Sequence, residues 1–296
     1  LVRLYRDGKP AVFADPLRLL PSTPKAGDLI FVPSHPASTE RLLTNAQLEF
    51  QRDHFLPWRI EYLAQIRGEM LAESTKGDEE ARQIIETLSN VENSLKVFKG
   101  QRGALVEPSF FAVKAGEEKK LRDALAARSD LRAKCGDPFT DIAGIVAAQK
   151  QAYLPYQMLE ARYGAGSVLL NDARTLVRAA AERAKPERDR LPEFGGARLS
   201  SLEQSLLAEA AVHPVVEKLE IAFWLEKTRE YLGVAHPAVK ALFGTRTSRE
   251  IAAEIILSSQ VNDPGFRKRL WQNPDQVAQT NDPAIALVKK ADDAAR

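Results

Sequence analysis

Alternating apolar and polar positions open the chain. The stretch LVRLY alternates apolar and basic residues, Asp7-Gly8 is a strong signal for a two-residue turn, and PAVFA fits the returning strand of a hairpin. After Gly27-Asp28, the short apolar run LIFV ends at Pro33 and fits a third, more buried strand. Three strands form a piece of a sheet that is marginal alone. We therefore expect their partner strands in an absent part of a parent chain or in another chain.

From Ser38 onward the apolar spacing becomes helical. Two triplets have the spacing of a buried helix face: Leu63, Ile66 and Met70 at i, i+3 and i+7, and Val215, Leu219 and Ala222 at i, i+4 and i+7. The pattern predicts a mainly α protein, in which a large helical domain follows a short β segment.

Most breaks between the predicted helices have an Asx residue followed by proline. The Asx side chain can accept the unpaired amide hydrogens of the first turn, and proline fits the first helical position because its missing N–H costs nothing there. Helix starts are therefore predicted at Asp137-Pro138, Asp263-Pro264, Asn273-Pro274 and Asp282-Pro283. Pro57 instead falls inside a helical run, where we expect a kink, or an end near Phe55 and a restart with Trp58.

Composition and charge restrict the function classes. The chain has 296 residues, with 42 basic against 40 acidic side chains, so no net field would recruit nucleic acid or an anionic membrane. No apolar run approaches the roughly 18 residues of a membrane span, and no signal peptide is recognisable. The first residue is Leu1 rather than methionine, which suggests a piece of a longer chain, so the missing signal says nothing about compartment.

The histidines do not indicate a metal site. His213 and His236 each precede a proline, where helix-start roles are the main interpretation, and His54 lacks a second histidine at i+3 or i+4. The alternative of a catalytic His35, which follows a strand end, has no accompanying serine nucleophile motif. The single Cys135 excludes an internal disulfide and is most simply a small apolar residue near a helix end.

No pattern in the sequence indicates a cofactor. The sequence GAGS at 164–167 is neither a dinucleotide nor a P-loop fingerprint, and it lies between helical segments, which favours a loop or the turn before a helix. Paired carboxylates lie in polar runs that are typical of solvated helix faces. Taken residue by residue, the chain contains no complete catalytic machine and no predicted catalytic residue of its own.

Several stretches, taken in order, resemble one family. The segment FVPSHPASTERLLTNAQLEFQRDHFLPWRIEYL is similar to the strand-to-helix junction of bacterial dipeptidyl peptidases, whose best-known members are dipeptidyl peptidases seven and eleven. The other stretches that carry the resemblance are ENSLKVFKGQ, YLPYQMLE, ARTLVRAAAERAKPERDRLPEF, LEIAFWLEKTREYLG and NDPAIALVKKADDAAR. They cover nearly the whole chain and occur in the family's order.

The resemblance implies a secreted or periplasmic serine exopeptidase with a chymotrypsin-like double barrel and an inserted helical domain. Residues 1–38 would be a fragment of the barrel, and residues 39–296 the helical cap over the cleft, which helps hold the free amino terminus of a peptide substrate. The catalytic histidine and aspartate would precede Leu1 and the serine would follow Arg296, so this chain alone would be inactive. Family members are commonly dimers, so the resemblance allows a homodimer, and the oligomeric state stays open.

One binding residue follows from the resemblance. In the family, an asparagine of the helical domain helps to bind the α-amino group of the substrate, and the Asn93-Ser94 pair fits that motif best. Asn90 is the competing candidate, and a plain role in capping or solvating a helix is the alternative for both. An amide oxygen is a suitable acceptor for an ammonium group. The second function class left open is a helical binding or scaffolding module without hydrolytic activity.

Overall fold

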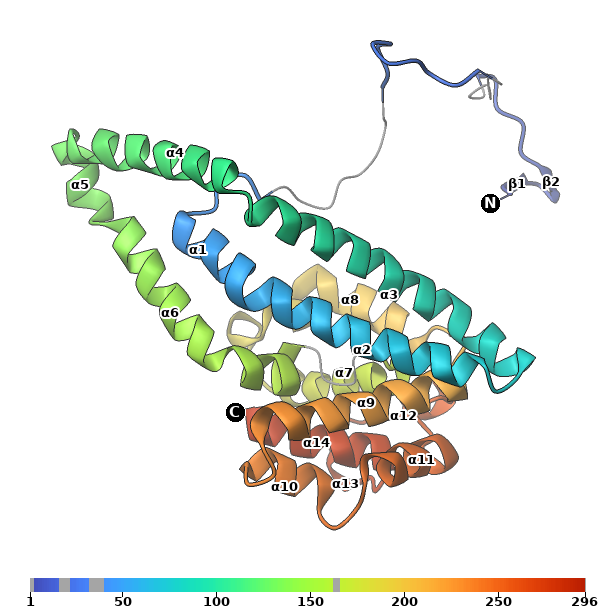
Figure 1. The fold of residues 1–296 in the computed structure, drawn as a ribbon. Coiled ribbons are helices and arrows are strands. Elements are labelled where there is room, and N and C mark those ends of the chain that lie inside the picture. The colour runs from blue at the N-terminus through green and yellow to red at the C-terminus, as the bar shows by residue number, and fades with distance from the viewer. Residues whose placement is uncertain (1–2, 16–21, 32–39, 162–165, 296) are drawn as a thin grey trace. The chain divides into compact units, whose positions relative to one another are not determined.

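The computed structural model describes residues 3–15, 22–31, 40–161 and 166–295. The chain divides into two compact units, Leu1–Leu42 and Leu43–Arg296, and each is described here by itself. The domain boundary expected between residues 38 and 39 lies outside the described residues. The protein is mainly α, as the apolar pattern predicted (Figure 1).

The first unit contains the predicted hairpin. Strands β1 (Tyr5–Arg6) and β2 (Lys9–Pro10) pair antiparallel, with Tyr5 opposite Pro10 and Arg6 opposite Lys9. Asp7 and Gly8 both have positive φ, 53° and 74°, which is the geometry of the tight turn that matches the twist of paired strands. The turn signal was therefore correct, although the ladder is much shorter than the alternating pattern.

The third predicted strand is wrong for the residues that the structure describes. Leu29, Ile30 and Phe31 form no strand and their side chains are exposed, while Val32 lies outside the described residues. A strand exists only through hydrogen bonds to a neighbour, and the described part of this unit offers LIFV no pairing partner. A local apolar run therefore indicates a tendency to form a strand, but it does not show whether a partner strand is present.

The second unit is built from helices. The first turn of α1 is closed by a capping box between Thr44 and Gln47. The α-helices are α1 (Asn45–Phe50), α2 (Leu56–Ser74), α3 (Asp78–Leu105), α4 (Pro108–Ala126), α5 (Ser129–Cys135), α6 (Pro138–Tyr156), α7 (Val168–Arg183), α8 (Gly196–Leu207), α9 (Pro214–Leu232), α10 (Pro237–Phe243), α11 (Ser248–Ser258), α12 (Pro264–Gln272), α13 (Pro274–Gln279) and α14 (Pro283–Ala295). Shorter turns are η1 (Gln51–Phe55), η2 (Gln157–Ala161), η3 (Glu187–Asp189) and η4 (Pro192–Phe194).

Pro57 perturbs its helix as expected, without breaking it. Helices α1 and α2 are continuous through the π-helical turn η1, and Leu56 donates its N–H back to Gln51, five residues earlier. Proline cannot donate and its ring crowds the preceding turn, so a wider turn before it accommodates both effects. Pro155 in α6 likewise lies just before a π-helical turn, η2.

The four Asx-Pro pairs all start helices. The side chains of Asp137, Asp263 and Asp282 accept amide hydrogens of the first turns of α6, α12 and α14. Asn273 precedes α13 without a side-chain cap bond. His213 and His236 also precede helix starts as predicted, and Nδ1 of His236 accepts from the N–H of Ala238.

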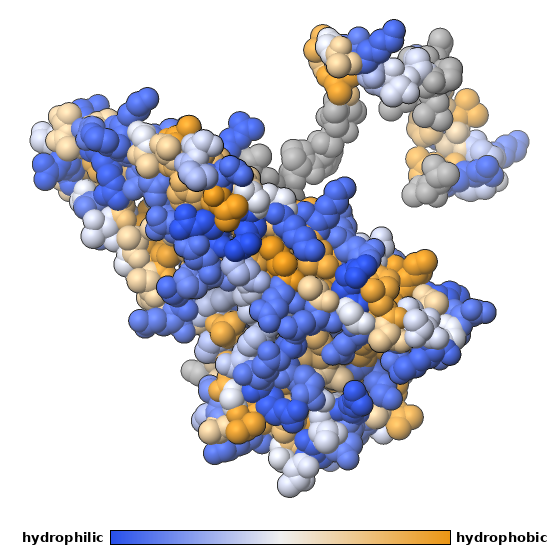
Figure 2. All heavy atoms as spheres, viewed as in Figure 1, coloured by the Kyte–Doolittle hydropathy of each residue, from blue (hydrophilic) through white to orange (hydrophobic). Residues whose placement is uncertain are grey.

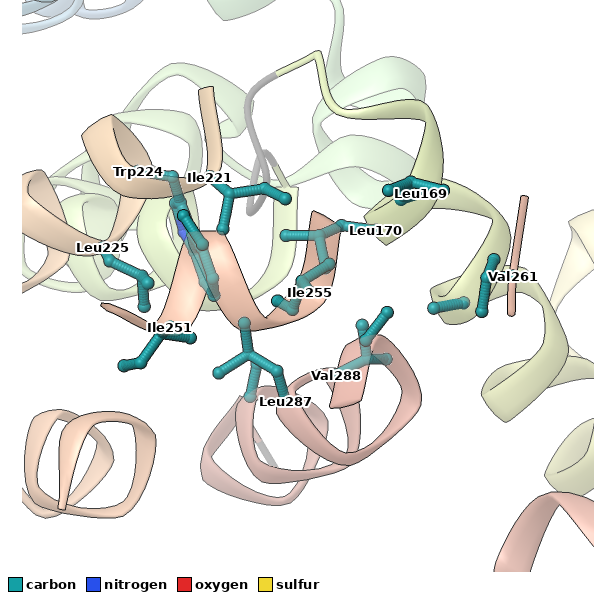
Figure 3. Packing of buried hydrophobic residues seen from close by; sticks show 14 of the residues in the cluster. Leu169, Leu170, Ile221, Trp224, Leu225, Ile251, Ile255, Val261, Leu287 and Val288 are labelled. Atoms are coloured by element: carbon teal, nitrogen blue, oxygen red, sulfur yellow. The ribbon is translucent and has the colours of Figure 1, made fainter. Parts of the chain in front are cut away.

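The hydrophobic core gathers around α7, α9, α11 and α14. Figure 3 shows that side chains from these four helices meet at one centre, and Val261 joins them from the turn before α12. Trp224 is fully buried there, and its indole Nε1 donates to the carbonyl oxygen of Met158 at 2.8 Å, which ties α9 to η2. The predicted face of α2, Leu63, Ile66 and Met70, is buried in the same cluster.

The predicted buried face of α9 is wrong. Val215, Leu219 and Ala222 are only half-buried at the edge of the core, whereas Ile221, Trp224 and others are fully buried. Helix α9 packs against α2 and α3, against α7 and η2, and against α10 and α11. Because neighbours surround it on several sides, the helix does not have the single apolar stripe that the spacing rule assumes.

Helices α4, α5 and α6 make an arm that buries little. None of the residues of α4 or α5 is buried, and α6 buries only Tyr153. In Figure 1, α4 and α5 lie at the end of the unit far from α10–α14, and α6 runs back from them towards α9. Figure 2 shows hydrophobic areas on this face of the molecule, interrupted by hydrophilic ones. Val113, Leu121 and Ile145 of the arm are among the exposed apolar side chains.

Candidate functional site

A cavity of about 140 Å³ lies between α2, α3 and α9, close to the start of α7. Its lining combines a small apolar floor with charged and polar groups, the usual make-up of a site for a small ligand. The lining residues are Arg59, Tyr62, Leu63 and Ile66 of α2, Thr87, Asn90, Val91 and Ser94 of α3, Gly166 before α7, and Glu220 of α9.

Helix α3 contributes the uncharged polar wall. Thr87, Asn90 and Ser94 lie at i, i+3 and i+7, so the helical repeat places their side chains on one face. Asn90 is exposed and Thr87 and Ser94 are half-buried, so this wall reaches the surface. Two hydroxyls and an amide provide oxygen acceptors along it.

Helix α9 contributes two buried glutamates with different surroundings. Glu217 is saturated: its carboxylate accepts from Oγ of Ser167 at 2.5 Å and from the N–H groups of Val168 at 2.8 Å and Leu169 at 3.3 Å. It thereby satisfies the first turn of α7 and complements its dipole. Burial raises the pKa of Glu217, and the hydrogen bonds oppose that effect.

Glu220 lies one turn further along α9 and has no such partners. Its side chain forms no hydrogen bond or ion pair within the described residues, although the residue is only 5% exposed. Burial, together with the negative charge of Glu217, raises the pKa of Glu220 to about 8. A carboxyl group of this kind is held mostly protonated at neutral pH until a cation reaches it.

Gly166 makes room for the Glu220 carboxylate. A Cβ at position 166 would lie 2.6 Å from Oε1 and 3.0 Å from Oε2 of Glu220. Any other residue at this position would push the carboxylate away from its present place, because real Cβ atoms do not approach oxygen so closely. Gly166, which belongs to the stretch predicted as a loop or a turn before a helix, is therefore also part of the cavity wall.

Helix α2 adds a cation that does not neutralise Glu220. The guanidinium of Arg59 lies over the ring of Tyr62, 5.6 Å from its centroid, and is absent from the charges that move the pKa of Glu220. The ring of Tyr62 packs edge-on against Phe223 of α9 at 4.9 Å between centroids. These aromatic contacts fix the α2 wall against α9.

The sequence of residues 1–296 matches the family described as Peptidase S46. The chain belongs to the Peptidase S46 family. The predicted resemblance is thereby confirmed at the level of the family, that of dipeptidyl peptidases seven and eleven, which are serine-type peptidases. No curated protein matches the chain in a sequence comparison.

In the described residues of this S46 chain, no histidine is hydrogen-bonded to a serine hydroxyl. His54 stacks on Phe50, His236 accepts from a backbone amide, and no hydrogen bond joins either of them, or His213, to a serine hydroxyl. His35, the alternative catalytic histidine, lies outside the described residues. Among the described residues there is also no group of three His, Cys, Asp or Glu side chains that could hold a metal ion.

The structure places the two candidate asparagines of the S46 chain differently. Asn90 lines the cavity opposite Glu220, whereas Asn93, which is exposed on the same helix, does not line it. Sequence reasoning missed Glu220 altogether. The signal was present, because this glutamate interrupts the apolar run of LEIAFWL in α9, where a charge that is not solvated needs a reason.

Two remaining expectations concern Cys135 and membrane spans. Cys135 ends α5 and is exposed, so the expected position near a helix end is correct. In the part of the chain that the structure describes, no helix combines the length and apolar character that crossing a membrane requires.

Proposed function

We propose that this chain forms the helical cap of a serine-type dipeptidyl peptidase, which removes dipeptides from the amino termini of peptides. The match to Peptidase S46 along residues 1–296 carries the proposal, and the helical unit Leu43–Arg296 agrees with a cap rather than with a catalytic barrel. The hairpin β1–β2 would then belong to the barrel part of the same parent protein.

The catalytic triad is proposed to come from parts of the parent protein outside residues 1–296. This agrees with the described histidines, whose contacts serve helix starts and ring stacking. A serine peptidase needs its general base within hydrogen-bond reach of the nucleophile. The purified chain is accordingly expected to release no dipeptide by itself. The parent is proposed to be a periplasmic or secreted protein and a homodimer, on the family resemblance.

The cap is proposed to bind the amino terminus of the substrate through an asparagine of α3. The sequence motif favours Asn93, and the position in the cavity wall favours Asn90. Either amide oxygen can accept a hydrogen bond from an ammonium group. The cavity geometry gives Asn90 the added advantage of a carboxylate on the facing helix.

The test is dipeptide release by the full-length parent on a panel of fluorogenic dipeptidyl substrates. Wild type is compared with Asn90→Ala, Asn93→Ala and, as a matched control, Asn171→Ala on the exposed side of α7. Loss of the binding asparagine is expected to cost about 2–5 kcal/mol in kcat/KM, as for a charged group left without its partner. Asn171→Ala is expected to keep full activity.

The outcomes separate the proposals. Loss with only one of the two asparagine variants identifies the binding residue. Full activity of both Asn90→Ala and Asn93→Ala would refute the asparagine role while leaving the peptidase standing. A parent that cleaves no substrate of the panel would refute the peptidase function and favour a helical binding module.

A further inference from the structure

Three chain segments join α1 and the α4–α6 arm to the other helices of the unit, and each has a proline beside an irregular turn. The first is the π-helical turn η1, which leads from α1 into α2, with Pro57 in the first turn of α2. The second is the break between α3 and α4, where Pro108 begins α4. The third is the π-helical turn η2, which follows α6 and its Pro155. The regular hydrogen-bond ladder of an α-helix is therefore interrupted at each of these crossings.

Helix α1 is packed into the arm. It lies between α4 and α6 and contacts both of them (Figure 1). The N–H of Asn45, at the start of α1, donates to the carboxylate of Glu118 in α4 at 2.7 Å. Phe50 of α1 packs edge-on against Tyr153 of α6, with 5.3 Å between the ring centroids. These contacts make α1 and the arm one packed group of helices.

The main hydrophobic core does not extend into this group. Among the described residues, the core cluster includes none from α1, α4, α5 or α6. A separate, smaller cluster lies at the crossings, where Leu48 of α1, Leu56 of α2 and Leu105 of α3 are buried together. Phe110 and Phe111 of α4 pack against it and are half-buried. A segment with few buried apolar contacts can move at a lower cost in free energy than the core can.

The turn η2 is fixed to the core side of the crossing. The carbonyl oxygen of Met158 accepts from Nε1 of Trp224 at 2.8 Å, and that of Glu160 accepts from the guanidinium of Arg174 at 2.7 Å. Met158 is fully buried in the main core. Bending between α6 and the core is therefore confined to the stretch around Pro155, just before Met158.

A cavity of about 300 Å³ lies between the two π-helical turns. One wall comes from α1 and η1, including Gln51 and Phe55, and the other from α6 and η2, including Tyr153 and Gln157. Close-packed side chains resist displacement, because any shift creates overlaps or voids. The cavity leaves room for side chains to change position where the segments would have to bend.

We propose that α1 and the arm pivot as one rigid body about a hinge formed by η1, the α3–α4 break and η2. Hinges are typically a few residues at the ends of helices or in loops that absorb a change in backbone angles, and all three crossings are of this kind. Because Pro57 and Pro155 donate no backbone hydrogen bond, a π-helical turn can change its pitch there without breaking one. The hinge belongs to the helical unit itself and does not depend on the proposed peptidase function.

The experiment measures distances between pairs of nitroxide labels by double electron–electron resonance. The single cysteine of the chain, Cys135, is exposed at the end of α5 and takes one label. The second label is placed either on the exposed Lys240→Cys of α10 or on the exposed Glu49→Cys of α1. We expect the distance distribution between positions 135 and 240 to be at least twice as broad as that between 135 and 49. Both pairs share the label at Cys135, so its own mobility contributes equally to both widths.

A third pair is the control for rigidity away from the arm. It combines Cys135→Ser with Lys240→Cys on α10 and Lys268→Cys on α12, both of which are exposed. Its distribution is expected to be as narrow as that of the pair 135 and 49. Proline variants then test the mechanism in the pair 135 and 240. Pro57→Ala combined with Pro155→Ala restores two N–H donors, so the turns can close as regular α-helix and the distribution should narrow.

The matched control for these prolines is Pro264→Ala at the first position of α12. The amide of that position has no intrahelical acceptor, so the width of the distribution should not change. A distribution for 135 and 240 as narrow as that for 135 and 49 would refute the hinge. Equal breadth of both would show that the arm bends internally and would refute the rigid body. If the double proline variant folds, as judged by circular dichroism, and keeps the full width, the π-helical turns are not the pivot. If it does not fold, the comparison of the label pairs with all prolines in place decides the proposal.

Discussion

Arg178 and Asp292 are 114 positions apart in the sequence, and Nε of Arg178 donates to Oδ1 of Asp292 at 2.7 Å. The contact joins α7 to α14, and both side chains are almost fully buried. Arg178 also reaches Glu160 of η2 through both terminal nitrogens, at 2.6 and 2.5 Å. The guanidinium of Arg178 therefore joins three elements of the helical unit: its own helix α7, the turn η2 that follows α6, and the carboxyl-terminal helix α14.

Arg178→Met is expected to destabilise the helical unit strongly. The substitution removes the guanidinium that pairs with the buried Asp292, and breaking a buried pair from one side costs about 3–5 kcal/mol. Urea unfolding followed by circular dichroism measures the free energy of unfolding. The control is Arg67→Met, which breaks the exposed pair with Glu92 and is expected to cost no more than about 1 kcal/mol. Equal losses for the two variants would contradict the structural role of the buried pair.

Arg267→Lys is expected to destabilise the protein although charge is conserved. The guanidinium of Arg267 is almost fully buried and donates to the carbonyl oxygens of Leu206, Ala208, Val261 and Asn262 at 2.6–3.0 Å. A lysine has a single nitrogen and cannot reach these acceptors together, so about 2–4 kcal/mol should be lost.

The matched control for Arg267 is Arg269→Lys, two residues further along α12. Arg269 is exposed, and its guanidinium lies over the ring of Phe266. Thermal unfolding of both variants provides the comparison. A melting temperature for Arg267→Lys that equals that of Arg269→Lys would show that the buried fork of hydrogen bonds contributes nothing.

Asp282→Ala is expected to weaken the start of α14. The Asp282 carboxylate accepts from the N–H groups of Gln260 at 2.7 Å, Ala284 at 3.0 Å and Ile285 at 3.3 Å, so it both caps the helix and anchors the preceding loop. Loss of a capping side chain costs about 0.5–2 kcal/mol, and we expect the upper end because a loop amide is released as well. Asn273→Ala is the comparison, because its side chain makes no cap bond at the start of α13 and donates one hydrogen bond, at 2.9 Å, to the carbonyl oxygen of Arg269. If chemical denaturation gives the same free energy of unfolding for both, the capping argument is wrong.

The free energy of unfolding is expected to depend on Glu220 in a defined pH range. The pKa of this carboxyl group is raised from 4.5 in the unfolded chain to about 8 in the folded one, so the folded state holds the proton more tightly. Its contribution to stability is complete below about pH 4.5 and falls as the pH rises to about 8. The total loss is of order 3–5 kcal/mol.

Glu220→Gln removes this dependence and provides the measurement. Unfolding in urea at pH 4.5, 6 and 8 should show the variant close to wild type at the lowest pH and progressively more stable than wild type above it. The exposed Glu86→Gln on α3 serves as the control and should follow wild type at each pH. A constant difference between Glu220→Gln and wild type would contradict the raised pKa.

Turns and helix starts in this chain could be predicted from the sequence without a structure. Asp7-Gly8 forms the tight turn, and Asp137-Pro138, Asp263-Pro264 and Asp282-Pro283 cap and start helices, because each effect depends on residues only two or three positions apart. The face of α2 marked by Leu63, Ile66 and Met70 was also correct. Helix α2 buries one side, so the helical spacing of its apolar residues is enough to identify its buried face.

Other predictions failed because they depend on which strands or helices pack against the segment in the folded chain. Leu29 to Phe31 are apolar enough for a strand but have no strand to pair with in the described chain. Helix α9 is surrounded by several helices, so the triplet Val215, Leu219 and Ala222 marks its edge rather than its buried face. Glu220 could be seen in the sequence only as an unusual charge in an apolar run.

The sequence by itself determined the helical class, the helix starts at the Asx-Pro and His-Pro pairs, and the family to which the chain belongs. The tertiary structure alone decided which side chains meet: Arg178 with Asp292, Glu217 with the first turn of α7, and Glu220 with the wall of α3. The physical reason is the range of the interactions. Caps and turns act over a few residues, whereas burial, ion pairing and the pKa of a carboxyl group depend on packing between segments that are far apart in the chain.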